Sequence, residues 1–519
     1  MTPPFELEDQ GPITYSWAEK KDGNIINQLA YVPSLKELYE ELLRKENTIC
    51  SLVRHHLQLG HDEVCTVLPQ ADWIRGSFNV CVPVEMTSGT SCRKVMLRCC
   101  LPHKLAEAWY SGTIDEKLSC EAGTYAWMQE NCSDVRIPHL YGFGFTDHRH
   151  YTHEAHRPWY IRLFRMLQRP FNSILRRTTL SHYTPNSSSH RLPTAYMLLE
   201  HIGPNVGQML SNTWNRQRDD VHRRRRLFRG IARAMLSLAR TPQPRIGSFQ
   251  FHDDCCVRLT NRPLTCSMMI LENDGTPRTI QRTETHSCTE SFVSDMLLFH
   301  DNRLLTDPNI VYDEADCQGN MAAKALLRAL SHKYIKRELR NGPYVLQFTD
   351  LHASNIFVDE AWNVTCCIDL EWIAALPAEM LAVPYWLTGC KLDEVEGARL
   401  SEFDEIRQEF MLILKEEEKK AAASHSIPLS RVMEEMWDSK GVWFWYCLES
   451  VNAMYYLVSD HICPQYGASL SPKMEAILSK FWCADSQGMI KKKMDKLEEY
   501  QMKLRQVFQQ GELRTSRTS

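Results

Sequence analysis

A polar loop beside two short β-rich runs is the feature that most restricts how this chain can fold. The loop carries Asp350 and, five positions later, Asn355, which enters the first run. A turn at Asp359–Asn363 follows, and the second run reaches Asp369. A hairpin of this length brings Asn355 and Asp369 side by side. The segment therefore predicts a polar site at one end of a small antiparallel hairpin.

The residue types of this loop indicate metal and phosphate chemistry. An amide oxygen from Asn355 and a carboxylate oxygen from Asp369 are hard ligands that suit Mg²⁺, which takes its other ligands from water and phosphates. Asp350 would then face a substrate hydroxyl as the base or orienting group. Each aspartate alone is a common turn former, so the prediction depends on the spacing of all three residues.

The two halves of the hairpin also resemble a known family. Asp350-Leu-His-Ala-Ser-Asn355 and Ile368-Asp-Leu-Glu-Trp372 are similar to the catalytic loop and metal-binding strand of aminoglycoside phosphotransferases, the fungal members in particular. That family is part of the protein-kinase-like superfamily. The resemblance implies ATP- and Mg²⁺-dependent transfer of the γ-phosphoryl group to a hydroxyl or amine of an unidentified small molecule. A role in fungal small-molecule metabolism is compatible with it.

The resemblance covers about residues 70 to 500 and implies a two-lobed α+β, protein-kinase-like fold. A small antiparallel, β-rich N-lobe is expected over residues 70–202 and a large α-rich C-lobe over 203–505. An N-terminal helical extension is expected over 1–69 and a disordered tail over 506–519.

Hydrophobic patterning predicts several elements directly. The β-rich runs Phe78–Val84 and Val95–Leu101 predict a hairpin, and a helix is expected over Asp115–Gln129. After about residue 290 the chain is predominantly helical. There, Ser401 followed by Asp404 predicts a capping box at the start of a helix.

The resemblance also implies a phosphate-binding region in the N-lobe. The run Arg75–Val80 is similar to the loop that covers the phosphates, with Ser77 and Asn79 as binding residues. The following strand should place a cation over the α and β phosphates. Most kinases use Lys at that position, whereas this strand offers Arg98 at one end and Lys94 at the other.

Two more parts of the nucleotide site follow from the same resemblance. Glu121 matches the helix glutamate that orients the strand cation, although a glutamate at this position is also typical of a solvated helix face. Tyr196–Ile202 resembles the hinge between the lobes. There the backbone at Glu200 and Ile202 would hydrogen-bond the adenine edge.

Two departures from the family pattern favour a second hypothesis. The position two residues before Asp350, where the family has His, is Phe348, and the strand cation is Arg98. An arginine is a planar, permanently charged fork, so it binds phosphate with a different geometry from lysine. The alternative is therefore a non-catalytic nucleotide-binding or scaffold protein. Retention of Asp350 together with Asn355 and Asp369 favours the enzyme.

Two basic segments have alternative interpretations. Residues 147–191 look like an insertion with eight Arg against one Asp and one Glu. They predict either a surface loop with a short helix or a basic amphipathic patch for a membrane or partner. The run Arg223–Arg226 predicts a solvated helix end, or else an anion patch or nuclear address.

Composition limits the remaining classes of function. The chain has 519 residues and a formal net charge of −4, which is not the footprint of a nucleic-acid-binding protein. The N-terminus lacks the pattern of a secretory signal, and the most apolar stretch, Ala374–Leu387, is too short to span a bilayer. The 19 cysteines without a C-x-x-C pair favour reduced, mostly buried thiols. The expectation is a cytoplasmic protein.

Overall fold

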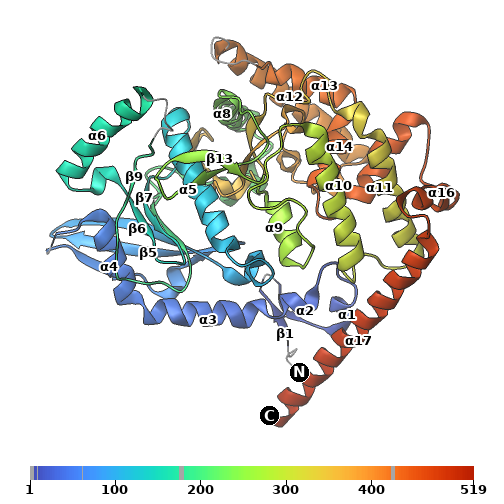
Figure 1. Ribbon diagram of the computed structural model, residues 1–519, viewed down its shortest axis with the longest axis horizontal. Coiled ribbons are helices and arrows are strands. Elements are labelled where there is room, and N and C mark those ends of the chain that lie inside the picture. The colour runs from blue at the N-terminus through green and yellow to red at the C-terminus, as the bar shows by residue number, and fades with distance from the viewer. Residues whose placement is uncertain (1–4, 9, 61, 175–179, 422–426, 519) are drawn as a thin grey trace.

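The computed structural model describes residues 5–8, 10–60, 62–174, 180–421 and 427–518. It is a mixed α/β structure with antiparallel sheets and many helices. In Figure 1 the large sheet lies at one end of the molecule, and the helices of the second half of the chain gather at the other end.

The large sheet has eight strands, and every pairing within it is antiparallel. Its order is β3-β5-β6-β10-β7-β8-β9, with β4 paired to β5. The strands are β3 (Val64–Val67), β4 (Ile74–Arg75), β5 (Asn79–Ser88), β6 (Ser91–Cys100), β7 (Leu140–Gly144), β8 (His150–His153), β9 (Tyr183–Pro185) and β10 (Tyr196–Glu200).

The β5–β6 hairpin confirms the prediction made from the two β-rich runs. Ser88 lies opposite Ser91, so Gly89 and Thr90 form a two-residue turn. Gly89 has a φ of 56°, in the left-handed region that two-residue hairpin turns need and that glycine adopts without strain. The hairpin places Asn79 on β5 and Arg98 on β6 close to each other, since Asn79 lies opposite Cys100, two residues after Arg98.

Helices cover both faces of this sheet. The helix α4 (Glu46–Leu57) packs its buried face against one side, after α1 (Tyr15–Ala18), α2 (Ile25–Gln28) and α3 (Tyr31–Arg44). On the other side lies α5 (Thr113–Asn131), which confirms the expected helix and starts two residues earlier. Most of α5 is buried because it lies between the sheet and the hairpin of β12 (Ser248–Phe251) and β13 (Val257–Asn261). At Gly123 a Cβ atom would stand 3.1 Å from the backbone of Phe251, so a larger residue would require this backbone to shift by a few tenths of an ångström.

The basic insertion is part of the sheet at both ends, which corrects the expectation of a separate surface loop. Its strand β8 pairs with β7, and β9 pairs with β8, and Tyr183 on β9 is fully buried. The expected short helix is α6 (Trp159–Ile174) (Figure 1), which exposes Phe164 and is joined to β9 by hydrogen bonds from the buried Arg165 to the carbonyl oxygens of Ser181 and Tyr183. The arginines at 176 and 177 lie outside the described residues. The segment was mispredicted because β8 and β9 are buried on both faces although they consist largely of polar residues such as His150, Thr152 and Thr184.

The second half of the chain is mainly helical, as expected. Its helices are α7 (Trp214–Gln217), α8 (Val221–Ala239), α9 (Cys266–Asn273), α10 (Thr289–Thr306), α11 (Glu314–Tyr334), α12 (Gly397–Ala421), α13 (Leu429–Asp438), α14 (Gly441–Glu449), α15 (Met454–Leu457), α16 (Pro472–Trp482) and α17 (Ser486–Thr518). Three small antiparallel sheets lie among them, built from β11 (Gln208–Met209), β12, β13, β14 (Val345–Phe348), β15 (Ile356–Val358), β16 (Val364–Cys367) and β17 (Ile373–Leu376).

Two of these helices bear on predictions made from the sequence: the capping box at Ser401 and the arginine run Arg223–Arg226. The helix α12 already begins at Gly397, so Ser401 lies inside it and the predicted capping box is wrong. Asp404 instead accepts hydrogen bonds from Arg407 and Gln408 on the same helix. The run of four arginines lies in the first two turns of α8, where two of them pair with Glu409 on α12.

The two ends of the described chain pack against each other. The last helix, α17, carries Tyr500, Leu504 and Phe508 at helical spacing, and these bury Ile13 and its neighbours. The hairpin of β1 (Phe5–Leu7) and β2 (Gly11–Ile13) belongs to the same cluster. Residues 506–518, expected as a disordered tail, therefore continue α17 in the structure. The expected N-terminal helical extension also contains β1, β2 and the sheet strand β3.

Searched over the described residues, the structure contains no helix with the length and apolar character needed to cross a membrane. All 19 cysteines fall within the described ranges, and each is a free thiol, most of them buried.

Candidate functional site

A cavity of about 470 Å³ lies where the large sheet meets the β15–β16 hairpin. One side is formed by the β4–β5 turn and by strand ends of β6 and β10, and the other by the loops around β15 and β16. Nearly every residue predicted as a site from the sequence lines it: Ser77, Asn79, Arg98, Glu200, Ile202, Asp350, Asn355 and Asp369. Segments separated by more than 250 positions in the sequence thus meet around one space.

Arg98 stands at the centre of the polar wall. Its guanidinium group donates hydrogen bonds to Glu121 on α5 and to Asp369, and lies 3.0 Å from a carboxylate oxygen of Glu371. Arg98 is only 8% exposed, so these charged contacts are shielded from solvent. Lys94, the other candidate cation, lies on the surface beside Glu85. Glu121 therefore pairs with Arg98, whereas Lys94 pairs with Glu85 on the surface.

Lys117 is a second buried cation that the sequence analysis did not identify. It lies one helical turn before Glu121 on α5, 3.4 Å from that carboxylate, and it also pairs with Glu371. Its Nζ atom donates to Oδ1 of Asn79 over 3.0 Å, and Nδ2 of Asn79 donates to Glu371 over 2.8 Å. The side chain of Asn79, predicted to bind nucleotide, is therefore engaged in this network.

The network contains more carboxyl groups than cationic groups. Arg98 and Lys117 face three carboxylates, those of Glu121, Asp369 and Glu371, whose oxygens lie within 4.8 Å of one another. Asp350 lines the same cavity and adds a fourth carboxylate. A divalent cation that entered with a polyphosphate would offset the negative charge of these groups.

The loop before β15 positions Asp350 and Asn355 through its own backbone. Nδ2 of Asn355 donates to the carbonyl oxygen of Asp350 over 2.9 Å, which leaves Oδ1 of Asn355 as the available metal ligand. The backbone N–H of Ile368 donates to the carbonyl oxygen of Asn355, so Asp369 follows directly beside it. The hairpin predicted from the sequence is thereby confirmed as the pair β15–β16.

Asp369 has an unusual backbone conformation. Its φ is 62°, a region that a non-glycine residue occupies at a steric cost and that is enriched at functional sites. The side chain remains 29% exposed toward the cavity although the neighbouring Glu371 is almost fully buried. The strained backbone therefore directs this carboxylate into the cavity, where it is accessible to a ligand.

Burial changes the acidity of Asp350. Desolvation raises the pKa of this carboxyl to about 7, and the negative charges of Asp369 and Glu371 add to the rise. A hydrogen bond with the thiol of Cys266 acts in the opposite direction. Such a displaced pKa is typical of carboxyl groups that exchange protons with a substrate.

The predicted hinge residues close the far end of the cavity. Strand β10 ends at Glu200, whose backbone N–H donates to the carbonyl oxygen of His139 over 2.8 Å. The carboxylate of Glu200 accepts hydrogen bonds from Arg136 and from the backbone of His139. The strand end is therefore fixed on one side, and the backbone around Ile202 borders the cavity on the other. Opposite it, Gly76 of the β4–β5 turn donates to Asn79, so the exposed Ser77 lies at the tip of the turn.

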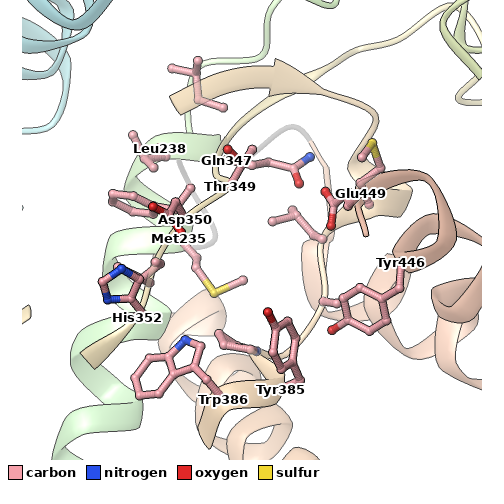
Figure 2. A pocket seen from close by; sticks show the side chains of 17 residues that line it. Met235, Leu238, Gln347, Thr349, Asp350, His352, Tyr385, Trp386, Tyr446 and Glu449 are labelled. Atoms are coloured by element: carbon pink, nitrogen blue, oxygen red, sulfur yellow. The ribbon is translucent and has the colours of Figure 1, made fainter. Parts of the chain in front are cut away.

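A second, smaller cavity of about 190 Å³ also borders Asp350 (Figure 2). Asp350 and His352 line both cavities. The smaller one is bordered by Tyr385, Trp386 and Tyr446 and by Glu449 at the end of α14. The sequence analysis named none of these four residues.

Two of the residues that were not predicted, Lys117 and Glu371, could have been identified from the sequence. Lys117 and Glu121 are spaced as partners on one helix face, and Glu371 belongs to the segment used for the family resemblance. Glu449 ends an aromatic, apolar helix about 100 residues after Asp350, and no local pattern links the two.

Comparisons with known proteins add little. No protein-family model matches the chain, and no curated protein matches it. Among solved structures it is similar to an ethanolamine kinase from Plasmodium vivax, with 11% identity, 81% of this chain and 82% of that chain covered, and a TM-score of 0.34. A similarity of this size establishes neither a family nor an activity, so the proposals below depend on the residues of this chain.

Proposed function

We propose that the protein is an ATP-dependent phosphotransferase of the protein-kinase-like type, which transfers the γ-phosphoryl group to a hydroxyl or amine of a small molecule. In this proposal the β-rich part and the helical part are the two lobes, and the larger cavity is the nucleotide cleft. The observation that carries it is the meeting of Arg98–Glu121 with Asp350, Asn355 and Asp369 around that one cavity.

Each side of the cavity supplies what a nucleotide needs. The backbone of Glu200 and Ile202 would hydrogen-bond the adenine edge, and the turn with Ser77 and Asn79 would cover the phosphates. Arg98, fixed by Glu121, would hold the α and β phosphates with a planar pair of donors. These positions support ATP as the donor.

The donor set fits Mg²⁺. Asn355 contributes an amide oxygen and Asp369 a partly exposed carboxylate, which are ligands that this hard cation accepts in combination with phosphates. When bound, the ion would neutralise charge between the phosphates and the acidic wall. Arg98 would then be free to exchange its contact with Asp369 for a phosphate oxygen.

Asp350 is proposed to act on the acceptor. Its carboxylate would accept the proton of the acceptor hydroxyl while that oxygen forms a bond to the γ-phosphorus and the bond from this phosphorus to the leaving ADP oxygen breaks. Positioning and charge neutralisation supply most of the rate in such transfers. The raised pKa of Asp350 suits a group that takes up a proton near neutral pH.

One contact favours the alternative of a nucleotide-binding scaffold. Arg98 pairs with Asp369, the expected metal ligand, and Phe348 replaces the histidine that the resemblance leads one to expect. A protein that kept this pair closed would bind nucleotide without transferring phosphate.

The decisive experiment compares Asp350→Asn with the wild type in phosphoryl transfer to a library of small alcohols and amines. Loss of a positioned base lowers rates by about 10²–10⁴-fold, whereas ATP binding should change little. Glu360→Gln, on the exposed β15–β16 turn, is the matched control and should behave as wild type. Equal turnover by Asp350→Asn would remove this residue from the mechanism. ATP binding without turnover in the wild type would support the scaffold.

A further inference from the structure

The helix α6 presents an apolar face to solvent. Many of the large apolar side chains that are exposed in the described chain lie within the first nine residues of this helix: Trp159, Tyr160, Leu163, Phe164, Met166 and Leu167. Trp159 is 72% exposed and Phe164 is 64% exposed. Figure 1 shows α6 at the outer edge of the part of the molecule that contains the large sheet. A contiguous apolar patch of this kind marks a surface that another molecule covers.

The opposite face of α6 attaches the helix to the protein through arginines. The buried guanidinium group of Arg165 donates hydrogen bonds to the carbonyl oxygens of Ser181 and Tyr183, over 2.8 and 3.0 Å. Arg169, four residues later, donates to both carboxylate oxygens of Glu154, over 2.8 and 2.5 Å. A rotation of the helix that buried its apolar face would break these contacts. The orientation is therefore fixed, and its polarity is the reverse of that of an ordinary surface helix.

The charge around this face has one sign. Residues 155–192, which include α6, contain seven Arg and neither Asp nor Glu, in a chain whose formal net charge is −4. Because Arg165 and Arg169 face the protein, Arg162 is the exposed charge beside the apolar side chains. Aromatic and aliphatic groups bordered by arginine, without acidic groups, are complementary to the surface of an anionic membrane. There the apolar groups enter the boundary below the headgroups, and the cations contact lipid phosphates.

From this geometry we infer that α6 docks the protein on the surface of a membrane that contains anionic lipids. The helix would lie parallel to the bilayer surface, with Leu163 and Leu167 in the boundary between headgroups and acyl chains and Trp159 at the level of the headgroups. Arg162 would contact lipid phosphate. Since Arg165 keeps the helix attached to β9, the docked protein would retain its fold. The inference does not depend on the proposed phosphotransferase function.

The first test measures binding of the full chain to lipid vesicles by co-sedimentation. Vesicles of phosphatidylcholine with about 30% phosphatidylserine should bind the wild type at least about tenfold more tightly than vesicles of phosphatidylcholine alone. This preference should fall as salt is added, because the exposed charges are screened. Arg162→Gln should weaken binding to the anionic vesicles about fivefold. Absence of binding to both kinds of vesicle at low salt would overturn the inference.

The second test assigns the binding to α6. One variant replaces three of its exposed side chains, Leu163→Gln, Phe164→Gln and Leu167→Gln, and should bind the anionic vesicles at least about tenfold more weakly. The matched control makes the same change on the exposed face of α16, Met474→Gln, Ile477→Gln and Phe481→Gln, and should bind as the wild type does. Thermal unfolding of the three proteins should coincide, because the replaced side chains are exposed. Equal binding by the two triple variants would overturn the inference.

A second copy of the chain is the other molecule that could cover this face. Size-exclusion chromatography with light scattering, in the absence of lipid, gives the oligomeric state of the wild type and of the α6 triple variant. A dimer that the variant converts to a monomer would overturn the inference, because the apolar face would then be an interface between copies. A monomer in both cases, together with binding to anionic vesicles, would support the membrane surface as the partner.

Discussion

The two cavities that share Asp350 treat buried carboxylates in opposite ways. In the larger cavity, Glu121 and Glu371 are almost fully buried and each has cationic partners in Arg98 and Lys117. In the smaller cavity, Glu449 has no partner among the described residues. Paired carboxylates stabilise the groups around them, whereas an unpaired buried carboxylate lowers the stability of the folded protein once it ionises. The first cluster is therefore part of the framework, and Glu449 is not.

Removing a cation from the paired cluster should have the largest effect. Lys117→Met keeps the volume of the side chain but leaves Glu371 and Glu121 with one partner fewer in a buried site. We expect a loss of about 3–5 kcal/mol in the free energy of unfolding, measured by urea denaturation. Lys94→Met, in the exposed pair with Glu85, is the control and should change it by less than about 1 kcal/mol. Similar effects of both substitutions would show that the cluster is not a framework.

The acidic excess of the larger cavity predicts that nucleotide binding depends on a divalent cation. With Mg²⁺ we expect ATP to bind at least about tenfold more tightly than in EDTA, because four carboxylates face two cations there. Asp369→Ala should remove this difference, and calorimetry measures it directly. If the wild type bound ATP equally with and without Mg²⁺, the assignment of Asn355 and Asp369 as ligands would be wrong.

The contact between Arg98 and Glu121 predicts coupling between the two residues. Arg98→Ala and Glu121→Ala should each weaken ATP binding, and the double variant should lose less than the sum by about 0.5–3 kcal/mol. The control cycle combines Lys94→Ala with Glu121→Ala, which are not in contact and should be additive. Additivity in the first cycle would mean that Glu121 does not orient Arg98 for the nucleotide.

The smallest expected effect is a gain in stability at Glu449. Its pKa is raised from an ordinary 4.5 to about 8, so the folded protein loses stability as the pH rises from about 4.5 through about 8. Glu449→Gln should therefore melt with the wild type at pH 4.5 and a few degrees above it at pH 9. Asp350, His352, Tyr385 and Tyr446 also face this cavity and remain in both proteins, so their titration largely cancels. A variant that melts lower at pH 9 would show that Glu449 has a partner.

Local sequence patterns anticipated part of this organisation. Alternation and a two-residue turn were enough for the β5–β6 hairpin, and the spacing of Asp350, Asn355 and Asp369 was enough for the β15–β16 hairpin. The pairing of Arg98 with Glu121 followed from a resemblance, and the geometry agrees with the contact. These features depend on residues near each other in sequence or on a known arrangement.

The remaining features depend on contacts that no local pattern records. The strands β8 and β9 were not expected because their burial follows from sheet pairing, of β8 with β7 and of β9 with β8, and not from a local pattern. The cavity around Glu449 is formed by the packing of α14 beside the loop that carries Asp350. The start of α12 likewise lies four residues before the predicted cap, at Gly397. In each case tertiary packing, rather than sequence periodicity, determined the outcome.

The packing of Tyr500, Leu504 and Phe508 against the first strands has a consequence for how the protein is made. The hydroxyl of Tyr500 accepts a hydrogen bond from the backbone of Ile25, a contact that joins positions 475 residues apart. At ordinary rates of translation, about 5–20 residues per second, the N-terminal hairpin leaves the ribosome roughly 25–100 s before its partner helix exists. During that interval Phe5, Leu7 and Ile13 are apolar and uncovered, so this segment is where a nascent chain would most need a chaperone.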